Sequence, residues 1–591
     1  MVIRENDDAI HDGIRTSPED PVKELISMIH ITCEGRSFDF FDGATPQNLW
    51  NMVRGTRGKE QAVLAEMDGE LLDFQTPFPS GGDVRWIPLS APKAHQAYVR
   101  SAIMLLVCAV EEIYGEGADV LVKHSLGKSL YCEFEDGHVP LKKELDRLAE
   151  RMREISEEGR DITKLVVGKK RAMAFLRIKG REEDAELAGQ LAGNTINVDQ
   201  CGRVIDYFFG PLLPDMSFVS LFALKSYAPG FLLRLPDEDF HLAQDEEEDP
   251  LFAKVFLESQ NWSELIGCQN LAQLNASIEN GKILDYISIA EALHEKKLAE
   301  LADAICEAKP RIRLVCMAGP SSSGKTTFMR RLIVHLQVNG VRPVMISLDD
   351  YFRDRDEMQG EDWEDIHALD LDRFEGDITA LLEGKPVRLP TFNFITGKKE
   401  WNASPVTLGK GQPILVEGLH ALNPRLTYFV PGYQCMHIYL SALTQITINH
   451  HNRISTSDTR LLRRMVRDMQ FRGNPPEKTI SSWPGVRKGE ERNIFHFQGR
   501  ADVVFNSALL YEIPVLKRIV KPFLEEISKD SSAYGEARRL LEFLAPFREL
   551  DASLVPDHSL LREFVGYEGL GKVVPESVEL SHGSRLKDRL K

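Results

Sequence analysis

The sequence predicts a multidomain protein whose C-terminal half is an α/β domain built on a parallel sheet, preceded by small α+β domains. Three observations support this fold class. The chain has 591 residues, too many for one hydrophobic core, so about two to four domains are expected. From Arg311 onward, short apolar runs alternate with helical patterns, as in a parallel sheet covered on both faces. Before Arg311, period-two alternation around turns indicates hairpins.

The composition is that of an ordinary globular protein, with 43% hydrophobic and 27% charged residues. The net charge of -18 disfavours nucleic-acid binding by diffuse electrostatics, because phosphate contacts need clustered Lys and Arg. The eight cysteines are scattered without a CxxC pair, which favours reduced thiols in a cytoplasmic protein. The polar amino terminus and the lack of any stretch of about 18 apolar residues predict neither secretion nor membrane insertion.

The N-terminal half is predicted to hold two small α+β domains after a polar tail. Residues 1–25 are expected to be a mobile tail, since they are charged and lack hydrophobic periodicity. Residues 26–90 form the first domain, in which IHITCEGRSFDFF predicts a hairpin and residues 45–53 a short helix. Residues 91–280 form the second, with a buried helix in SAIMLLVCAVEEIYG, a hairpin in LVKHSLGKSLYCEF and an acidic, solvated loop at 243–250.

Further elements follow along the chain. Segments rich in Glu, Lys and Arg predict helices from about Leu141, and strands are expected near Val204–Phe208 and Phe231–Leu235. Residues 281–310 carry apolar residues at helical spacing and predict a connecting helix. The remaining residues, 311–591, are predicted to form one α/β domain. Its expected strands are IRLVCMAG, RPVMISLD, QPILVEG, CMHIYLSA and DVVFNSA.

A phosphate-binding loop follows the first of these strands. GPSSSGKT matches G-x-x-x-x-G-K-[ST] and lies between an apolar strand and the helical segment TFMRRLIVHLQ. Backbone N–H groups of such a loop face nucleotide phosphates, Lys325 would bridge the β and γ phosphates, and Thr326 would ligate Mg²⁺. ATP and Mg²⁺ are therefore the expected cofactors, and a glycine-rich turn without nucleotide is the alternative. The predicted nucleotide-binding residues are Gly319, Pro320, Ser321, Ser322, Ser323, Gly324, Lys325, Thr326, Thr327, Arg463 and Arg467.

Carboxylates follow two other predicted strands. ISLDDYF places Asp349 at the carboxyl edge of the sheet, where open α/β folds bind ligands. A carboxylate there can orient an acceptor hydroxyl and accept its proton. ILVEG ends in Glu417, which is suited to hold Mg²⁺ directly or through water. The predicted metal ligands are Thr326, Asp349 and Glu417, while helix capping, the alternative role, suits Asp350 better.

A basic helix supplies the third component of the predicted site. TRLLRRMVR spaces four arginines so that most can share one helix face: Arg460, Arg463, Arg464 and Arg467. Such a cluster can close over a triphosphate and stabilise charge during transfer. A solvated helix paired with Asp458 and Asp468 is the alternative for one or two of them. The predicted catalytic residues are Lys325, Asp349, Arg460 and Arg464.

With these motifs in order, residues 311–472 resemble the uridine kinase and phosphoribulokinase family of P-loop kinases. The resemblance rests on AGPSSSGKTT, ISLDDYF, LPTFNFITGKK, ILVEG and TSDTRLLRRMVRD. It implies that Asp349 activates the acceptor hydroxyl and that the DTRLLRR segment belongs to a mobile lid. It also implies an acceptor pocket formed by Asp349, Asp370, Phe392 and Arg460.

One position departs from this family. Uridine-cytidine kinases carry a His shortly after the aromatic residue of the TFNFITGKK region, where it helps read the pyrimidine, and Gly397 stands at that place here. A site that loses a buried hydrogen-bonding partner loses discrimination. The acceptor is therefore left open between a uridine-like nucleoside, another nucleoside and a sugar.

The N-terminal half also resembles known domains, on the segments VKHSLGKSLYCEF, DYFFGPLLP, APGFLLRLP and ALHEKKLAELAD. Residues 26–90 resemble a TGS domain, and residues 91–280 resemble the second additional, editing-like domain of threonyl- and alanyl-tRNA synthetases. This order ahead of a kinase resembles long bacterial proteins described as uridine kinase-like or nucleoside kinases. The metal-binding motifs of the editing domain are replaced at Arg100, Met104, Cys201 and Ile205, so no hydrolytic site is expected. Three further histidines are expected to be structural: His124, His450 and His451.

Taken together, the motifs predict an ATP-dependent kinase that transfers the γ-phosphoryl group to a hydroxyl of a nucleoside or related small molecule. The alternative is an RNA-associated ATP-binding regulator that uses the N-terminal modules. A GTPase is disfavoured because no N-K-x-D segment follows the phosphate loop. The expected partners are a small-molecule acceptor and a second copy of the chain, with no membrane, and RNA is left open.

Overall fold

The described residues of the chain form two compact units. The computed structural model describes residues 28–53, 62–127, 129–242, 250–308, 311–358, 363, 365–393, 396–444 and 446–566. The N-terminal unit takes the described residues of Met1–Glu246, Asn449–Asn452 and Ile527–Phe543, and the C-terminal unit takes those of Glu247–Ile448, Arg453–Glu526 and Leu544–Lys591. The predicted tail at 1–25 and the acidic run at 243–249 lie outside the described residues. The finer domain boundaries near residues 90, 280 and 310 stay predictions.

The N-terminal unit begins with a five-stranded sheet in the order β2-β1-β5-β3-β4. Its elements are β1 (Met28–Cys33), β2 (Arg36–Phe41), α1 (Pro46–Val53), β3 (Ala62–Met67), β4 (Glu70–Leu72) and β5 (Gly82–Pro88). The predicted hairpin and helix are confirmed, because β1 and β2 pair antiparallel and α1 follows. Glu34 and Gly35 between these strands both have positive φ, the conformation that tight hairpin turns require.

A long buried helix organises the next part of this unit. Helix α2 (His95–Tyr114) and helix α3 (Lys142–Glu158) pack with an antiparallel sheet in the order β11-β12-β7-β6. The strands are β6 (Val120–Leu126), β7 (Ser129–Phe134), β11 (Ala223–Tyr227) and β12 (Gly230–Arg234). The predicted buried helix and the β6–β7 hairpin are confirmed, as is the strand expected near Phe231–Leu235.

A smaller layer completes the N-terminal unit. A three-stranded sheet in the order β10-β9-β8 packs on two short helices around its own apolar cluster. These elements are β8 (Ile162–Gly168), α4 (Lys169–Ile178), α5 (Glu182–Gln190), β9 (Thr195–Cys201) and β10 (Val204–Asp206). Helix α14 (Tyr534–Leu544) returns to this unit from far along the chain, up to Phe543.

The described part of the C-terminal unit contains a five-stranded sheet in the order β14-β17-β13-β18-β19. All of its neighbouring strands pair in parallel, which confirms the predicted parallel sheet. The strands are β13 (Leu314–Ala318), β14 (Val344–Ser347), β17 (Ile414–Glu417), β18 (Cys435–Ser441) and β19 (Val503–Asn506). Each falls within one of the five apolar runs read from the sequence.

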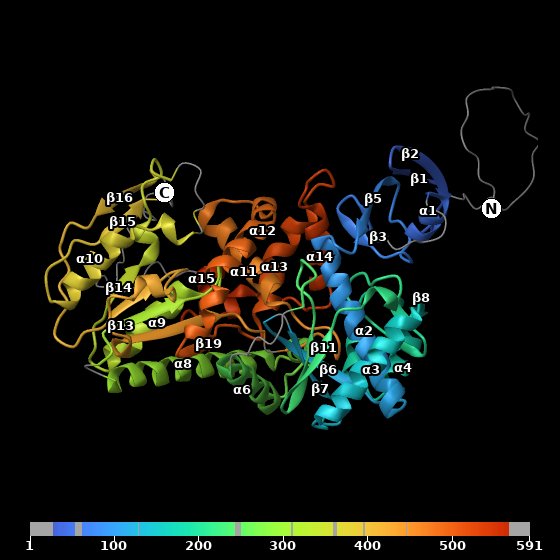
Figure 1. Cartoon of the computed structure of the whole chain (residues 1–591), viewed down its shortest axis with the longest axis horizontal. Helices are drawn as coiled ribbons and strands as arrows, with labels where there is room; N and C mark the ends of the chain where they lie inside the picture. Colours follow the sequence, from blue (N-terminus) through green and yellow to red (C-terminus); the bar gives the residue numbers. More distant parts are fainter. Residues whose placement is uncertain are drawn as a thin grey trace, which may run out of the picture. The chain divides into compact units, whose positions relative to one another are not determined.

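Successive side chains along β13 point to opposite faces of the sheet, and both faces are covered. Val315 and Met317 pack against α8 (Ile283–Glu307) and α9 (Lys325–Val338), which lie along the strands in Figure 1. Leu314 and Cys316 belong to a second apolar cluster, which includes α10 (Leu371–Leu382). Because both faces are buried, the strands carry continuous apolar runs rather than alternating ones.

Other helices and a hairpin surround this sheet. They are α6 (Pro250–Ile266), α7 (Leu271–Glu279), the hairpin of β15 (Pro390–Asn393) and β16 (Lys398–Trp401), α11 (Thr456–Arg467), α12 (Pro476–Asn493), α13 (Glu512–Glu525) and α15 (Arg562–Val565). Helix α11 contacts α12, α13 and α15. In the portion of the chain that is described, no helix combines the length and apolar character needed to cross a bilayer.

Candidate active site

The ends of three adjacent strands gather the predicted site residues at one edge of the sheet. Strand β17 lies between β13 and β14, and its last residue, Glu417, aligns with Met317 on one side and Ser347 on the other. The phosphate-binding loop follows β13, and Asp349 lies in the short 3₁₀ turn Leu348–Tyr351 that follows β14. Parallel strands place these three carboxyl ends together, the position at which open α/β sheets bind ligands.

The loop from Gly319 to Thr326 depends on glycine at two positions. A Cβ on Gly319 would lie 2.2 Å from the carbonyl oxygen of Leu440, so β18 leaves no room for a side chain. Gly324 has φ +95° and directly precedes α9, a conformation that glycine adopts without strain. Lys325 opens the helix, and its Nζ donates to Gly319 O at 2.9 Å and Pro320 O at 3.1 Å. The loop therefore wraps an ammonium group at a helix N-terminus, an arrangement suited to anions.

Glu417 is an acid with a strongly shifted pKa at this edge. Its side chain is buried, and Oε1 accepts a hydrogen bond from Ser347 Oγ at 2.9 Å. Burial, followed by the negative charge of Asp349, raises the pKa of Glu417 to about 7, although Lys325 and the Ser347 hydrogen bond oppose the rise. The negative charge of Asp349 therefore reaches Glu417, which favours a cation at this edge.

The donor set fits a magnesium ion. Thr326, Asp349 and Glu417 offer one hydroxyl and two carboxylates, the hard oxygen ligands that Mg²⁺ prefers, and Mg²⁺ ordinarily completes its shell with water and substrate phosphates. Within the described residues, no group of three His, Cys, Asp or Glu side chains is placed to hold a metal ion. A metal at this edge would thus rely on the hydroxyl and on ligand phosphates as well as the two acids.

Arg460 contacts the phosphate-binding loop instead of facing solvent. Helix α11 begins at the cap Ser455, and Arg460 is 1% exposed. Its Nη1 and Nη2 donate to the two oxygens of the buried Glu490 at 2.6 and 2.9 Å, and Nη1 also donates to Ser321 O at 3.2 Å. Glu490 Oε1 in turn accepts from Ser321 N–H at 2.8 Å. The pair therefore holds both backbone groups of Ser321.

Arg463 has an equivalent position one turn along the helix. Its Nε donates to Glu512 at 2.6 Å, and Nη2 donates to Ser507 O at 2.8 Å. Nη1 lies within hydrogen-bonding distance of the carbonyl oxygens of Ser322 and Ser323, at 3.4 and 3.5 Å. The guanidinium thus contacts the loop backbone through its carbonyl oxygens.

Arg464 and Arg467 are less completely buried. Arg464 Nη1 donates to Ser321 Oγ at 2.7 Å, and the Nε atoms of Arg464 and Arg467 lie 3.5 and 3.7 Å from Asp468. Burial, then the neighbouring Arg472, lowers the pKa of Arg467 to about 10. Asp468 is therefore a partner of two arginines of α11, as the alternative interpretation expected, but the helix is packed and not solvated. The catalytic and nucleotide-binding roles of these four arginines stay predictions.

Asp370 contacts the β15–β16 hairpin, and Phe392 is part of this hairpin. Asp370 caps α10 through Arg373 N–H, and it accepts from Lys399 Nζ at 2.5 Å. Burial raises the pKa of Asp370, but Lys399 outweighs burial and the net shift is downward. Phe392 pairs with Lys399 across the hairpin and is 3% exposed. Its N–H donates to Asp350 Oδ1 at 3.1 Å, a contact that ties the hairpin to the turn carrying Asp349.

A known family matches the part of the chain that contains this site. The model of the Phosphoribulokinase / Uridine kinase family matches residues 314–512. The C-terminal half contains a domain of this family. The matched range spans β13, the phosphate-binding loop, β14, β17, β18, α11 and β19. The kinase-family domain thus includes every residue predicted for the site.

The N-terminal half matches a different group of proteins. Similar curated proteins include the threonine–tRNA ligase of Syntrophotalea carbinolica, 25% identical over 199 residues, covering 34% of this chain and 31% of the ligase. The threonine–tRNA ligase of Thermotoga maritima is 23% identical over 225 residues, covering 38% of this chain and 32% of the ligase. The chain thus spans about a third of the length of these relatives.

Two solved structures also resemble the chain. A proposed fructose transport system kinase from Silicibacter sp. TM1040 is 18% identical, covers 35% of this chain and 98% of that chain, and has a TM-score of 0.28. A possible uridine kinase from Bacillus stearothermophilus is 19% identical, covers 36% of this chain and 98% of that chain, and has a TM-score of 0.26.

The residue that departs from uridine-cytidine kinases lies in a crowded turn of the kinase-family domain. Gly397 has φ +69°, and a Cβ there would lie 2.7 Å from Arg355 Cβ. Gly397 O accepts from Arg355 N–H at 2.8 Å, so the two residues are held together. The space that a larger side chain at position 397 would need is filled by Arg355.

The residues that stand in place of the editing motifs make packing and hydrogen-bond contacts within the N-terminal unit. Met104 is fully buried in the core of the N-terminal unit, and Cys108 Sγ donates to Cys201 O at 3.7 Å. Arg100 Nε donates to Pro211 O at 3.0 Å. Burial, then Arg539, lowers the pKa of Arg100 to about 10. None of these contacts provides the imidazole ligands of an editing centre.

His450 and His451 belong to the N-terminal unit, where they join a balanced cluster of buried charges. His451 Nε2 lies 2.8 Å from Asp119, and Nδ1 contacts Asp206. His450 Nδ1 lies 3.0 Å from Asp184, and Arg181 lies 2.6 and 3.0 Å from Asp184 and Asp206. Burial lowers the pKa of His451, but Asp119 and Asp206 outweigh it and raise the value to about 10.

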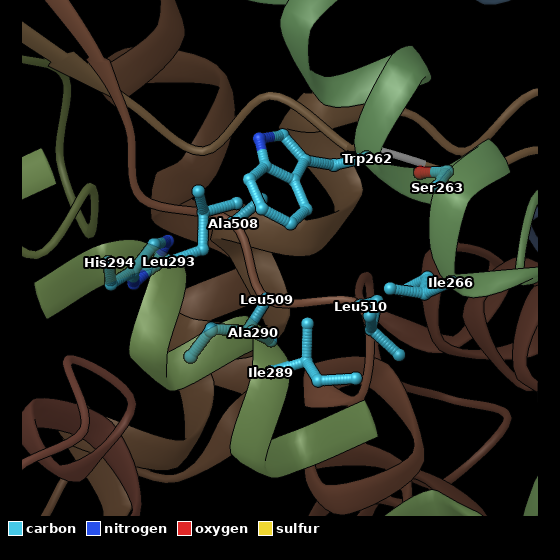
Figure 2. A pocket seen from close by; sticks show the side chains of 10 residues that line it. All are labelled: Trp262, Ser263, Ile266, Ile289, Ala290, Leu293, His294, Ala508, Leu509 and Leu510. Atoms are coloured by element: carbon cyan, nitrogen blue, oxygen red, sulfur yellow. The ribbon is translucent and has the colours of Figure 1, made fainter. Parts of the chain in front are cut away.

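An apolar recess in the C-terminal unit lies apart from this chemistry. Figure 2 shows it between side chains of α6, α8 and the loop that follows β19. Its volume is about 10 Å³, no more than one water molecule needs. Burial, then Arg463, lowers the pKa of its His294 to about 4, so the imidazole is neutral at pH 7. The recess is a packing defect in character and not a substrate site. Its lining residues are Trp262, Ser263, Ile266, Ile289, Ala290, Leu293, His294, Ala508, Leu509 and Leu510.

Proposed function

We propose that the chain is an ATP-dependent kinase that transfers the γ-phosphoryl group to a hydroxyl of a uridine-like nucleoside or a related small molecule. One observation carries this proposal: Glu417 ends β17, which lies between the strand that leads to the phosphate-binding loop and the strand that leads to Asp349. Burial and Asp349 raise the pKa of Glu417, and Lys325 opposes this rise. A triphosphate, a cation and an acceptor all need groups at that edge. The match of residues 314–512 to a kinase family supports it.

In this proposal each residue has a defined task. Backbone amides of residues 319–327 and the Lys325 ammonium bind the phosphates. Asp349 orients the acceptor hydroxyl and accepts its proton as the oxygen attacks the γ-phosphorus, while the bond from that phosphorus to the β,γ-bridging oxygen breaks and ADP leaves. Thr326, Asp349 and Glu417 would hold Mg²⁺, which would neutralise charge on the phosphates when bound. Arg464 would add positive charge, while Arg460 and Arg463 fix the loop through their contacts with Glu490 and Glu512.

The acceptor would bind beside the β15–β16 hairpin. Asp370 and Phe392 lie there, and the Asp350 contact to Phe392 N–H links them to the proposed base. Gly397 replaces the histidine expected of a pyrimidine reader, so recognition would rest on other polar groups. A uridine-like nucleoside, another nucleoside or a sugar fits this description.

The test is acceptor-dependent ADP release from Mg-ATP across a panel of nucleosides, sugars and sugar phosphates. We expect at least one acceptor to raise ADP release above the acceptor-free rate, and Asp349→Asn to lower that turnover by about a hundredfold or more. Asp372→Asn, an exposed acid on α10, is the matched control and keeps full turnover. Full acceptor-dependent turnover in Asp349→Asn would show that another group is the base.

A second candidate function is an RNA-associated ATP-binding regulator. The similarity of the N-terminal half to threonine–tRNA ligases favours it, at 25% identity over 199 residues for one of them. The net charge of -18 and the replaced editing residues weigh against it. Stimulation of ADP release by tRNA, with no response to any small acceptor, would favour this function over transfer.

A further inference from the structure

A glutamate near the end of the described chain lies on the amino end of the helix that follows the phosphate-binding loop. Glu563 is in α15, and its Oε2 accepts from Thr327 N–H at 3.0 Å. Thr327 is the third residue of α9, and the first four N–H groups of a helix have no partner within the helix. The carboxylate therefore takes a donor from the set that would bind a nucleotide phosphate.

The surroundings of Glu563 place its charge beside the other charged groups of the site. After burial, Asp349 and other groups, Glu563 contributes to the raised pKa of Glu417. Burial and Arg472 lower the pKa of Arg467, and Glu563 acts in the opposite direction and raises it. The charge of Glu563 therefore acts both on a predicted metal ligand and on the arginine helix.

The backbone around Glu563 is held firmly. Arg562 is 3% exposed, and its guanidinium donates to Gly566 O at 2.8 Å and to Val555 O. Leu560 joins the apolar cluster of α8 and α9, and Ser559 Oγ lies 3.3 Å from Tyr511 OH. Phe564 is fully buried, with its ring centroid 5.1 Å from the Arg463 guanidinium. Glu563 itself is only half-buried, so its side chain can turn away while the segment stays in place.

We infer that Glu563 is an internal competitor for nucleotide phosphate: its carboxylate caps Thr327 N–H and must leave before a phosphate oxygen takes that amide. A carboxylate and a phosphate use the same helix N-terminal donors, and their like charges exclude joint occupancy. The inference rests on the proposed function of residues 319–327 as a phosphate site. Glu563 of α15 would thus lower the affinity of the chain for nucleotide.

The test measures the Kd of Mg-ATP by calorimetry on the full chain without acceptor. Glu563→Gln keeps an oxygen that can accept from Thr327 N–H but removes the charge, so α9 stays capped. We expect the Kd of this variant to fall at least about fivefold below wild type. Glu526→Gln, an exposed glutamate at the end of α13, removes the same charge elsewhere and is expected to leave the Kd unchanged.

An equal or higher Kd for Glu563→Gln would overturn the inference, because it would make Glu563 a passive cap or a helper in binding. Tripolyphosphate, which has no base or ribose, should show the same gain, since competition is for phosphate alone. A gain with Mg-ATP that is missing with tripolyphosphate would also overturn it, as would the failure of both proteins to bind either ligand.

Binding and transfer are scored separately, so the two proposals can fail independently. If Glu563→Gln binds Mg-ATP more tightly but no acceptor is phosphorylated, the competition by Glu563 is supported and the kinase proposal is refuted. If an acceptor is phosphorylated while wild type and Glu563→Gln have the same Kd for Mg-ATP, the kinase proposal is supported and the competition by Glu563 is refuted.

Discussion

Ser347 Oγ donates a 2.9 Å hydrogen bond to Glu417 Oε1, joining the ends of β14 and β17. This bond favours the carboxylate form of Glu417, yet burial and Asp349 prevail and raise the pKa to about 7. The acid is therefore close to half-protonated at neutral pH. A bound cation, which needs the carboxylate form, must compete with a proton.

The first prediction concerns magnesium and pH. We expect Mg²⁺ to raise the Tm more at pH 8 than at pH 6, with the change centred near pH 7, because Glu417 loses its proton over this range. Ser347→Ala removes the bond that favours the carboxylate, so the midpoint should move to higher pH. Ser288→Ala, which removes an exposed hydroxyl on α8, should leave the midpoint unchanged. A Mg²⁺ effect independent of pH would contradict the assignment of Glu417.

The second prediction concerns the stability cost of Glu417 itself. Its pKa in the fold, about 7, lies above the ordinary value of 4.5, so ionising it opposes folding. The cost is absent below about pH 4.5, grows as the pH rises to about 7 and is full above that. Without Mg²⁺, Glu417→Gln should be more stable than wild type at pH 8 and equal to it near pH 4.5, as measured by thermal unfolding. Equal stability at both pH values would refute the cost.

The third prediction concerns the buried pair of Arg460 and Glu490. Arg460→Ala leaves a fully buried carboxylate without its cation, and we expect a loss of about 3–5 kcal/mol in urea unfolding. Replacing both residues by Met should recover most of that loss, since no uncompensated charge remains. Arg487→Ala breaks a more exposed pair with Glu491 and should cost less than about 1 kcal/mol. Additive losses in the double variant would refute the coupling.

The fourth prediction concerns His451, which is fully buried between Asp119 and Asp206. His451→Gln leaves an excess of negative charge and should destabilise the N-terminal unit by about 3 kcal/mol at pH 6. The raised pKa, about 10, means that the histidine contributes fully below about pH 6.5 and that the contribution is lost as the pH rises through about 10.

Chemical denaturation followed from pH 6 to pH 10 checks this expectation, and the difference from wild type should shrink across that range. His124→Gln is the control, because His124 is a half-buried histidine stacked on Tyr131 at 4.9 Å. An equal loss from both variants would remove any special role for the charge cluster.

The fifth prediction concerns Gly397. Gly397→His supplies the residue type that pyrimidine readers carry, but the positive φ and Arg355 oppose it. We expect a loss of more than about 1 kcal/mol and no gain in preference for uridine over other acceptors. Gly432→Ala, at a position where a Cβ meets nothing within 4 Å, is the control. A stable Gly397→His variant with a new preference for uridine would contradict this view of the turn.

The fold of the kinase-family domain could be predicted because its signals are local. Each strand is a short apolar run, and the loop that binds phosphate is a contiguous motif between a strand and a helix. The strand ends then bring Asp349, Glu417 and the loop together without further information. These parts of the prediction needed only neighbours in sequence and the rule that parallel strands share a carboxyl edge.

The partners of the arginines could not be predicted in the same way. Helical spacing correctly placed Arg460 and Arg463 on one helix, but Glu490 and Glu512 lie 30 and 49 residues farther along. Glu563 lies 236 residues from Thr327, in a segment without a motif. Such pairs are fixed by the packing of α11, α12, α13 and α15, which no local pattern encodes. His451 is a similar case, because its two carboxylate partners lie 245 and 332 residues away in the chain.

The membership of Asn449–Asn452 and Ile527–Phe543 in the N-terminal unit has a consequence for how such a protein can be divided. The chain leaves the C-terminal unit twice and returns twice, so no single cleavage separates the two units. A fragment starting at residue 281 would carry His451 without Asp119 and Asp206, exposing a cation whose counter-ions stayed behind. A gene rearrangement that moved the kinase half alone would likewise leave His451 without these two carboxylates.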